Sequence, residues 1–159
     1  MEHTIGTLKR LIWSDADFEE MGWHGAYVHA IAAIPENFEL MLDIDYIVQW
    51  VNPIPPEQHF KFWVAPATLV FSNVWNVKFC LESESGEFSI QGLERLNEQA
   101  TLNGKMTDWL WRFLGNEGSL SFRATAYKQH FRKQPILTLS QQLMLNERDG
   151  ISFNRESES

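Results

Sequence analysis

Apolar and polar residues alternate with a period of two along two long stretches near the start of the chain. Apolar residues occupy the even positions of residues 26–34 and again those of residues 38–50. Successive side chains of a strand point to opposite faces, so each stretch predicts a strand with one apolar face. The Pro-Glu-Asn between them predicts a turn, and aligning the two apolar faces pairs Ile34 with Phe38.

Shorter apolar stretches predict strands through most of the remaining chain. They cover residues 60–64, 67–71, 75–82, 87–96, 109–115 and 119–131. The links contain Gly, Asn, Ser and Pro, which favour turns, and the Gly-Asn-Glu-Gly at the end of the 109–115 stretch predicts a hairpin bend. Three prolines in the Val-Asn-Pro-Ile-Pro-Pro-Glu-Gln loop after the second long strand predict a stiff connection. Residues 139–145 predict a short helix or an edge segment.

One short helix is predicted near the N-terminus. Ser14 or Asp15 can cap it, acidic residues follow at its positive end, and Gly22 would end it. We therefore predict a mainly β fold, either an antiparallel two-layer sandwich or a strongly curved sheet of about eight strands. Residues 1–154 are predicted to form a single β-rich domain, followed by a disordered polar tail at residues 155–159.

Histidine and aspartate residues fall on the polar face of the predicted hairpin. In the favoured register His29 lies opposite Asp43, and Tyr27 lies opposite Asp45. Side chains directly across a ladder are about 5 Å apart at Cβ. This spacing predicts a His29–Asp43 hydrogen bond that would raise the pKa of the histidine and fix its tautomer.

The same cluster allows more than one role. In an enzyme His29 would act as a general acid–base that Asp43 orients, whereas a metal site would need His24, Asp45 or both as further ligands. His24 precedes His29 by five residues, so it points to the opposite face unless Gly25 forms a bulge or a turn. Because the spacing matches no metal signature, the cluster is better explained as a structural polar face or a partner site, and we predict no cofactor.

The charge is unevenly divided along the chain. The net charge is −8, with 15 acidic and 5 basic residues before position 101 and 6 acidic and 8 basic residues after it. An acidic body repels phosphate backbones, so we predict no nucleic-acid binding, and it suits a basic protein partner. The basic residues within the 123–133 segment are interpreted as balancing the acidic body.

Cysteine and apolar content bear on the compartment. Cys80 is the single cysteine, which excludes an intrachain disulfide, and it is predicted to be an inert buried thiol. No signal-like N-terminus and no bilayer-length apolar run occur, so we predict a soluble cytoplasmic protein without a membrane segment. Most of the seven tryptophans are predicted to fill the core, with an aromatic-lined cleft for a small ligand as the alternative.

The chain resembles a family of small bacterial proteins without an assigned function, over about residues 20–140. The residues that carry this resemblance are Trp23, His24, His29, the Leu-Asp-Ile-Asp-Tyr-Ile of 42–47 and the Phe-Trp-Val-Ala-Pro-Ala-Thr-Leu-Val-Phe of 62–71. Many members have an acidic residue where this chain has Gly25, which weakens a metal or catalytic interpretation. Small acidic proteins of this kind sometimes act as immunity partners of toxins. By this analogy of size and charge, we predict a non-catalytic, immunity- or inhibitor-like binding module.

Overall fold

The computed structural model describes residues 3–4 and 7–157 of the chain. The described strands are β1 His3–Thr4, β2 Thr7–Leu8, β3 Ile12–Ser14, β4 Tyr27–Ile34, β5 Glu39–Val51, β6 Lys61–Ser72, β7 Trp75–Leu81, β8 Phe88–Ala100, β9 Thr107–Gly115, β10 Gly118–Ala124, β11 Ala126–Phe131 and β12 Ile136–Thr138. The described helices are the two 3-10 helices η1 Asp15–Glu20 and η2 Pro35–Asn37 and the α-helix α1 Leu145–Arg148.

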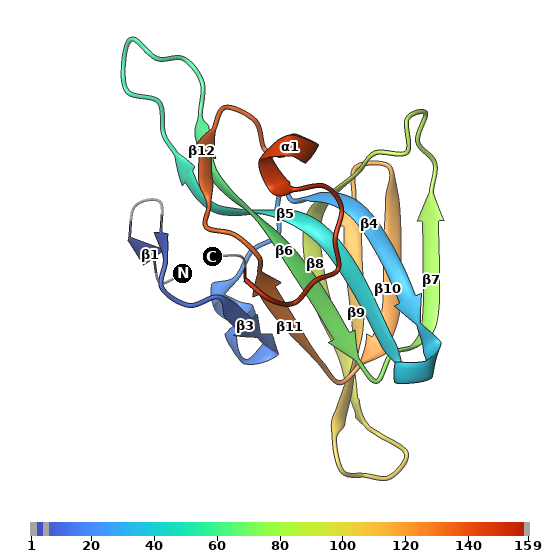
Figure 1. Ribbon diagram of the computed structural model, residues 1–159. Helices are drawn as coiled ribbons and strands as arrows, with labels where there is room; N and C mark the ends of the chain where they lie inside the picture. Colours follow the sequence, from blue (N-terminus) through green and yellow to red (C-terminus); the bar gives the residue numbers. More distant parts are fainter. Residues whose placement is uncertain (1–2, 5–6, 158–159) are drawn as a thin grey trace.

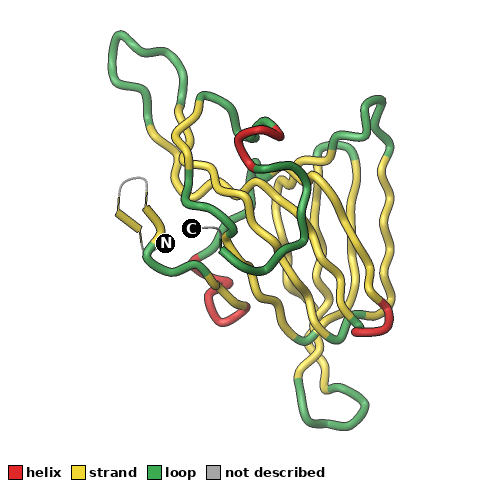
Figure 2. The backbone as a smooth tube through the Cα atoms, viewed as in Figure 1, coloured by secondary structure: helices red, strands yellow, loops and turns green. Residues whose placement is uncertain are grey.

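Ten of these strands form one continuous antiparallel sheet (Figures 1 and 2). Its order is β3-β11-β6-β5-β4-β8-β9-β10-β7, and β12 pairs with β6 beside β11. The short strands β1 and β2 pair only with each other among the described residues. The prediction of a mainly β, antiparallel architecture with few helices is confirmed.

The sheet folds over at its middle, where β4 and β8 share a short ladder. Only Tyr27 and Val28 of β4 pair with β8 in the described part of the chain. The strands from β3 to β4 therefore form a first layer, and those from β8 to β7 form a second layer. Phe71 of the first layer packs its ring 5.3 Å from that of Trp111 and 4.7 Å from that of Phe122, both in the second layer. The two predicted alternatives, a curved sheet and a two-layer sandwich, therefore describe the same structure, which is one sheet folded into two layers.

The core lies between the two layers and is rich in aromatic rings. The even positions of β5 point into it, as predicted, and Leu40, Leu42, Ile44 and Tyr46 are all buried. Buried rings from several elements join them: Trp13, Trp23, Phe71, Trp111, Phe113, Phe122, Tyr127 and Phe131. Trp50 and Trp75 are instead exposed, so the prediction of tryptophans in the core holds for only part of the set.

The predicted register of the first hairpin is shifted by one residue. Ile34 pairs with Glu39, because Phe38 adopts a left-handed conformation (φ 55°) that closes η2 and lengthens the turn. A β-bulge at His29 absorbs the extra residue and restores the predicted pairing from Val28 backwards. Beyond the bulge the even positions of β4 no longer carry the core face, and Ile31 packs against the core instead.

Two predicted strand boundaries were wrong for reasons of topology. The two strands predicted at residues 60–64 and 67–71 are one strand, β6, which runs through Pro66 opposite Asp45 of β5. On its other side Pro66 falls between the stretches that pair with β11 and with β12, so no ladder there requires its missing N–H. The predicted 119–131 strand divides at Thr125, where the chain passes from the second layer to the first.

The predicted N-terminal helix is present as η1. Ser14 caps it through a hydrogen bond from the Ala16 N–H to its side chain, and Asp17 accepts from the Ser14 N–H in return. Residues 139–144 form neither a helix nor a strand, and α1 begins only at Leu145. In the described part of the chain, no helix has the length and apolar character needed to cross a membrane.

The C-terminal segment, residues 139–157, lies over the outer face of the first layer (Figure 1). Within it Arg155 makes an ion pair with Glu39 at 2.8 Å. Residues 158–159 lie outside the described residues, so the disordered polar tail stays a prediction. The segment therefore covers strands β5 and β6 on the side away from the core.

Candidate functional site: a buried ion network and an open sheet edge

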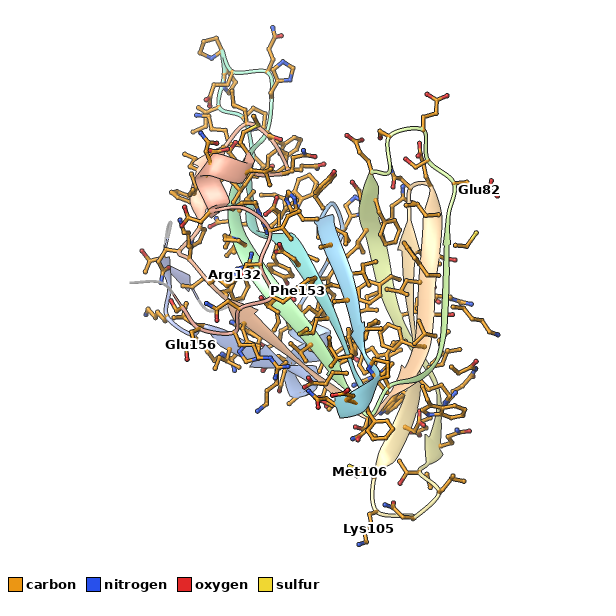
Figure 3. The ribbon with its side chains drawn as sticks, turned by 45° about the vertical axis from the view of Figure 1, so that its right-hand side comes forward. Glu82, Lys105, Met106, Arg132, Phe153 and Glu156 are labelled. Atoms are coloured by element: carbon orange, nitrogen blue, oxygen red, sulfur yellow. The ribbon has the colours of Figure 1, made fainter. Side chains whose placement is uncertain are left out.

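The two predicted aspartates lie under the C-terminal segment, not on the surface. Asp43 and Asp45 occupy odd positions of β5, which point away from the core, and both are fully buried. Figure 3 labels Arg132 and Phe153 where the segment crosses this face of the sheet. The polar face that the sequence predicted is thus an internal contact between the sheet and the segment.

Asp43 accepts hydrogen bonds from four donors of the second half of the chain. Arg148 donates through Nη2 at 2.6 Å and through Nη1 at 2.8 Å, and Arg132 donates through Nη2 at 2.7 Å. The backbone N–H of Ser152 donates at 2.9 Å. Both oxygens of the carboxylate are occupied, and two guanidinium groups share its charge.

Asp45 connects β4, β5 and the C-terminal segment. Its carboxylate accepts from Arg148 Nε at 2.9 Å and from the Leu143 N–H at 2.8 Å, and it bonds His29 Nε2 at 2.7 Å. The predicted partner of His29 was therefore wrong, because the bulge turns this side chain towards Asp45. Tyr27 stands opposite Asp45 in the ladder, as predicted, and its ring packs 4.7 Å from that of His29.

His24 does not join the cluster. Its Nδ1 bonds the Gln91 carbonyl at 3.0 Å, and its ring stacks on that of Trp50 with the centroids 6.0 Å apart. Gly25 does adopt a positive φ of 87°, but this turn does not aim His24 at Asp43 or Asp45. Among the described residues, no group of three or more His, Cys, Asp or Glu side chains is arranged to hold a metal ion.

The electrostatics of the network favour ionised groups. Burial by itself raises the pKa of Asp43, but hydrogen bonds from Arg148, the Ser152 N–H and Arg132 outweigh it and hold that pKa below its ordinary value of 3.8. Burial alone lowers the pKa of Arg148, and bonding to Asp43 with the charges of both aspartates raises it. The arrangement is a saturated set of buried ion pairs that fastens the C-terminal segment to the sheet.

Arg148 was not predicted as a site residue, and Arg132 was predicted only as part of a basic segment. A signal was present in the charge count, because the acidic first 100 residues and the net basic remainder have opposite net charges, and Arg132 and Arg148 pair with Asp43 across this division. Within the second half of the chain, Arg123 donates to Asp108 at 2.9 Å, and Lys133 pairs with Asp149. Three basic residues of the 123–133 segment therefore take part in internal ion pairs: Arg123, Arg132 and Lys133.

The lowered pKa of Asp43 sets the sign of one pH dependence. A depressed folded-state pKa stabilises the fold above the unfolded value of 3.8, and this contribution is lost as the pH falls through the folded value. We expect Asp43→Asn to lower the free energy of unfolding at neutral pH, and this effect to diminish progressively as the pH falls below about 4. Urea denaturation of both proteins across this range checks it. A difference that does not change with pH would mean that the ionised carboxylate is not what stabilises the fold.

A second feature is the open edge of the second layer at β7. In the described chain β7 pairs with β10 alone, and residues 30–34 of β4 pair with β5 alone. Phe79 aligns with the buried Leu120, so its side chain points to the core side, yet it remains 48% exposed. Val77 is 45% exposed. No described element covers the core at this edge.

Each end of β7 lies close to one end of β4. At one end the Val74 N–H donates to the Phe38 carbonyl at 2.8 Å, next to the β4–β5 turn. At the other end the ring of Phe79 lies 5.8 Å from that of Phe88, which pairs with Val28 near the start of β4. The edges of β4 and β7 therefore border the same open side of the sandwich.

The prediction that Cys80 is buried was wrong. Cys80 is exposed, because it aligns with Ser119 on the outer face of the second layer, opposite in direction to Phe79. Lys78 shares this outer face and aligns with Ser121. Val77 and Phe79 thus point towards the uncovered core and Lys78 and Cys80 point away from it, whereas Trp75 aligns with Arg123 beyond an irregularity in the ladder.

Four glutamates gather where β7 ends, in the loops that follow β7 and β9. We call this set the acidic corner, and its members are Glu82, Glu84, Glu87 and Glu117. The Glu82 N–H donates to the Glu117 carbonyl at 3.0 Å, which joins the two loops. None of the four makes an ion pair with a described residue. The charge of Glu87 contributes to a raised pKa of Tyr27, after the larger effect of burial.

A groove of about 650 Å³ lies at the opposite end of β7. We call it the end groove, and its apolar walls are Phe38, Val74, Trp75, Ala100, Leu102 and Met106. It lies between the β4–β5 turn and the β8–β9 hairpin, which extends beyond the sandwich in Figure 1. Trp75 donates from Nε1 to Asp108 at 2.7 Å, so its ring is fixed at the base of the groove.

No family model, curated protein or solved structure matches this chain.

Proposed function

We propose that the protein is a non-catalytic binding module that takes an extended segment of a partner protein along β7. The observation that carries this proposal is the open edge, where Val77 and Phe79 face the core side but are about half exposed. Apolar side chains turned inwards and left uncovered are the surface that an added strand would bury. Strand addition at a sheet edge is a recurrent mode of peptide recognition.

The backbone of β7 supports strand addition. The Glu82 N–H donates to the Glu117 carbonyl directly beyond the last aligned pair of the β7–β10 ladder, Leu81 and Gly118, and so continues its hydrogen-bonding pattern. Hydrogen-bonded and non-hydrogen-bonded pairs alternate in an antiparallel ladder, so the Phe79–Leu120 pair is of the second kind. The N–H and C=O of Phe79 therefore point towards the open edge, where a partner strand would bond them.

The charge at the edge defines the chemistry of the partner. The acidic corner places four carboxylates at the end of β7, and the chain as a whole carries a net charge of −8. A basic segment would be steered to this end, whereas a second copy of the chain would bring a further −8. The proposed partner is therefore a basic protein, in keeping with an immunity- or inhibitor-like role.

The ion network supports a binding role over a catalytic one. Asp43 and Asp45 are buried and fully hydrogen-bonded, and the His29 side chain is 8% exposed. A general acid–base must reach a substrate, and here the C-terminal segment lies over the carboxylates. Under this proposal the predicted site residues stabilise the fold and do not bind the partner; they are Tyr27, His29, Asp43 and Asp45. The binding surface lies at β7.

The proposal predicts that Phe79→Lys weakens peptide binding. Random peptides displayed on phage are selected against the purified protein, and the Kd of a synthetic selected peptide is measured by calorimetry. Lysine at this position opposes a basic segment and removes the apolar contact, so we expect at least about a tenfold loss of affinity. The selected sequences should combine alternating apolar residues with Lys or Arg.

Ser119→Lys is the matched control, because it adds the same charge on the outer face of the same layer. It should bind like the unchanged protein, and thermal denaturation should show both variants folded. Equal binding by Phe79→Lys would overturn the proposal. So would a homodimer in sedimentation that Phe79→Lys abolishes, because β7 would then serve self-association.

A further inference from the structure

We infer that the end groove binds a bulky apolar stretch at one end of the partner segment, while the acidic corner binds its basic end. This inference rests on the proposed function and adds where the apolar and the basic residues lie along the partner segment. Trp75 begins β7 and lines the end groove, whereas Glu82 directly follows the last residue of β7. The groove and the corner are therefore the two ends of one continuous docking edge.

The end groove is shaped before any ligand arrives. In the β8–β9 loop Asn103 Oδ1 accepts from the Thr101 hydroxyl at 2.7 Å and from the Lys105 N–H at 3.0 Å. The Thr101 N–H donates to the Met106 carbonyl at 3.0 Å, which closes the loop on itself. A preformed loop loses little conformational freedom on binding, so apolar contacts there translate more directly into affinity.

The apolar side chains of this loop have no role in the core. Leu102 is fully exposed and Met106 is 46% exposed, and Phe38, on the facing turn, is 63% exposed. Exposed apolar residues that converge on one groove mark an interaction site. The groove of about 650 Å³ lies within the range of ligand pockets and exceeds the size of one side chain. It therefore suits two bulky residues at the end of the segment, beyond the part that pairs as a strand.

The length of β7 sets the spacing between the two ends of the segment. The strand has seven residues, which span about 23 Å at the usual rise per residue. A partner segment in strand conformation would therefore place its apolar pair and its basic residues about six to seven positions apart. Strand addition allows either chain direction, so the order along the peptide is left to the experiment.

The probe is a fluorescein-labelled peptide with Leu-Phe at one end, a central Thr-Val-Thr-Val-Thr and Lys-Lys-Lys at the other end, made in both orders. A second pair of peptides replaces Leu-Phe by Ser-Asn. Fluorescence anisotropy gives the Kd of each peptide for the full chain. In one order we expect Leu-Phe to improve the affinity about tenfold over Ser-Asn.

The double variant Leu102→Glu, Met106→Glu tests the groove directly. It should remove the gain from Leu-Phe and leave the affinity for the Ser-Asn peptide unchanged. Lys105→Glu is the control, because Lys105 lies in the same loop but does not line the groove (Figure 3). This control should keep the full gain.

The outcomes separate this inference from the proposed function. If Leu-Phe gives no gain, or if the gain survives the double variant, the groove inference is overturned while edge binding stands. If no peptide binds in a manner that Phe79→Lys weakens, the proposed function fails and this inference fails with it. A groove that binds anilinonaphthalene sulfonate without displacement by the peptide is a small-ligand site, which also overturns the inference.

Discussion

Arg148→Ala is expected to cost about 3–5 kcal/mol of unfolding free energy, a large share of the stability of a domain of this size. Arg148 is fully buried and donates to both Asp43 and Asp45. Its removal leaves two buried carboxylates with less compensation than their desolvation requires. Urea denaturation monitored by tryptophan fluorescence measures the loss, and limited proteolysis reports whether the C-terminal segment is released.

Arg155→Ala is the matched control for this experiment. Arg155 belongs to the same C-terminal segment and pairs with Glu39, but its side chain is 44% exposed. Exposed pairs contribute about 0–1 kcal/mol, so the control should remain close to the unchanged protein. Equal stability of the two variants would show that the buried network does not hold the segment. If Arg148→Ala does not fold, Arg148→Lys provides the milder test, because lysine keeps the charge without the planar fork.

Trp111→Ala is expected to destabilise the fold by about 3–5 kcal/mol as well, through a cavity between the two layers. The Trp111 ring is fully buried and lies 5.3 Å from that of Phe71 and 5.5 Å from that of Tyr127. Its Nε1 donates to the Ala124 carbonyl at 3.1 Å, next to the corner where the chain changes layers. Denaturant midpoints measure the loss.

Trp50→Ala provides the comparison for the core substitution, because Trp50 is 41% exposed at the far end of β5. Truncation of a partly exposed ring creates no closed cavity, so the expected loss is about 1 kcal/mol or less. Comparable losses for the two tryptophans would contradict face-to-face packing of the layers around Trp111.

Much of the fold followed from local patterns in the sequence. The period of two in β5, the caps of η1 and the glycines between β9 and β10 each act over a few residues, so each was readable. The register of β4 was not readable, because it depends on Phe38 entering a left-handed turn and on the compensating bulge at His29. The break predicted between residues 64 and 67 was wrong, because Pro66 is tolerated through the placement of β11 and β12, which lie far along the chain.

The site was only partly predictable, for a related reason. The odd positions of β5 did point away from the core, but periodicity does not reveal what covers an outer face. Arg148 lies more than a hundred residues after Asp43, and no local pattern links the two. The open edge at β7 was also hidden, because the sequence of β7 resembles that of a central strand and only the pairing order places it last.

The distance along the chain between the two aspartates and Arg148 also bears on biosynthesis. Strands β4, β5 and β6 leave the ribosome well before residue 148 is made, so the nascent sheet carries two carboxylates whose guanidinium partner does not yet exist. The buried ion network therefore cannot form until residue 148 has left the ribosome, so the nascent sheet remains without these ion pairs through most of its synthesis.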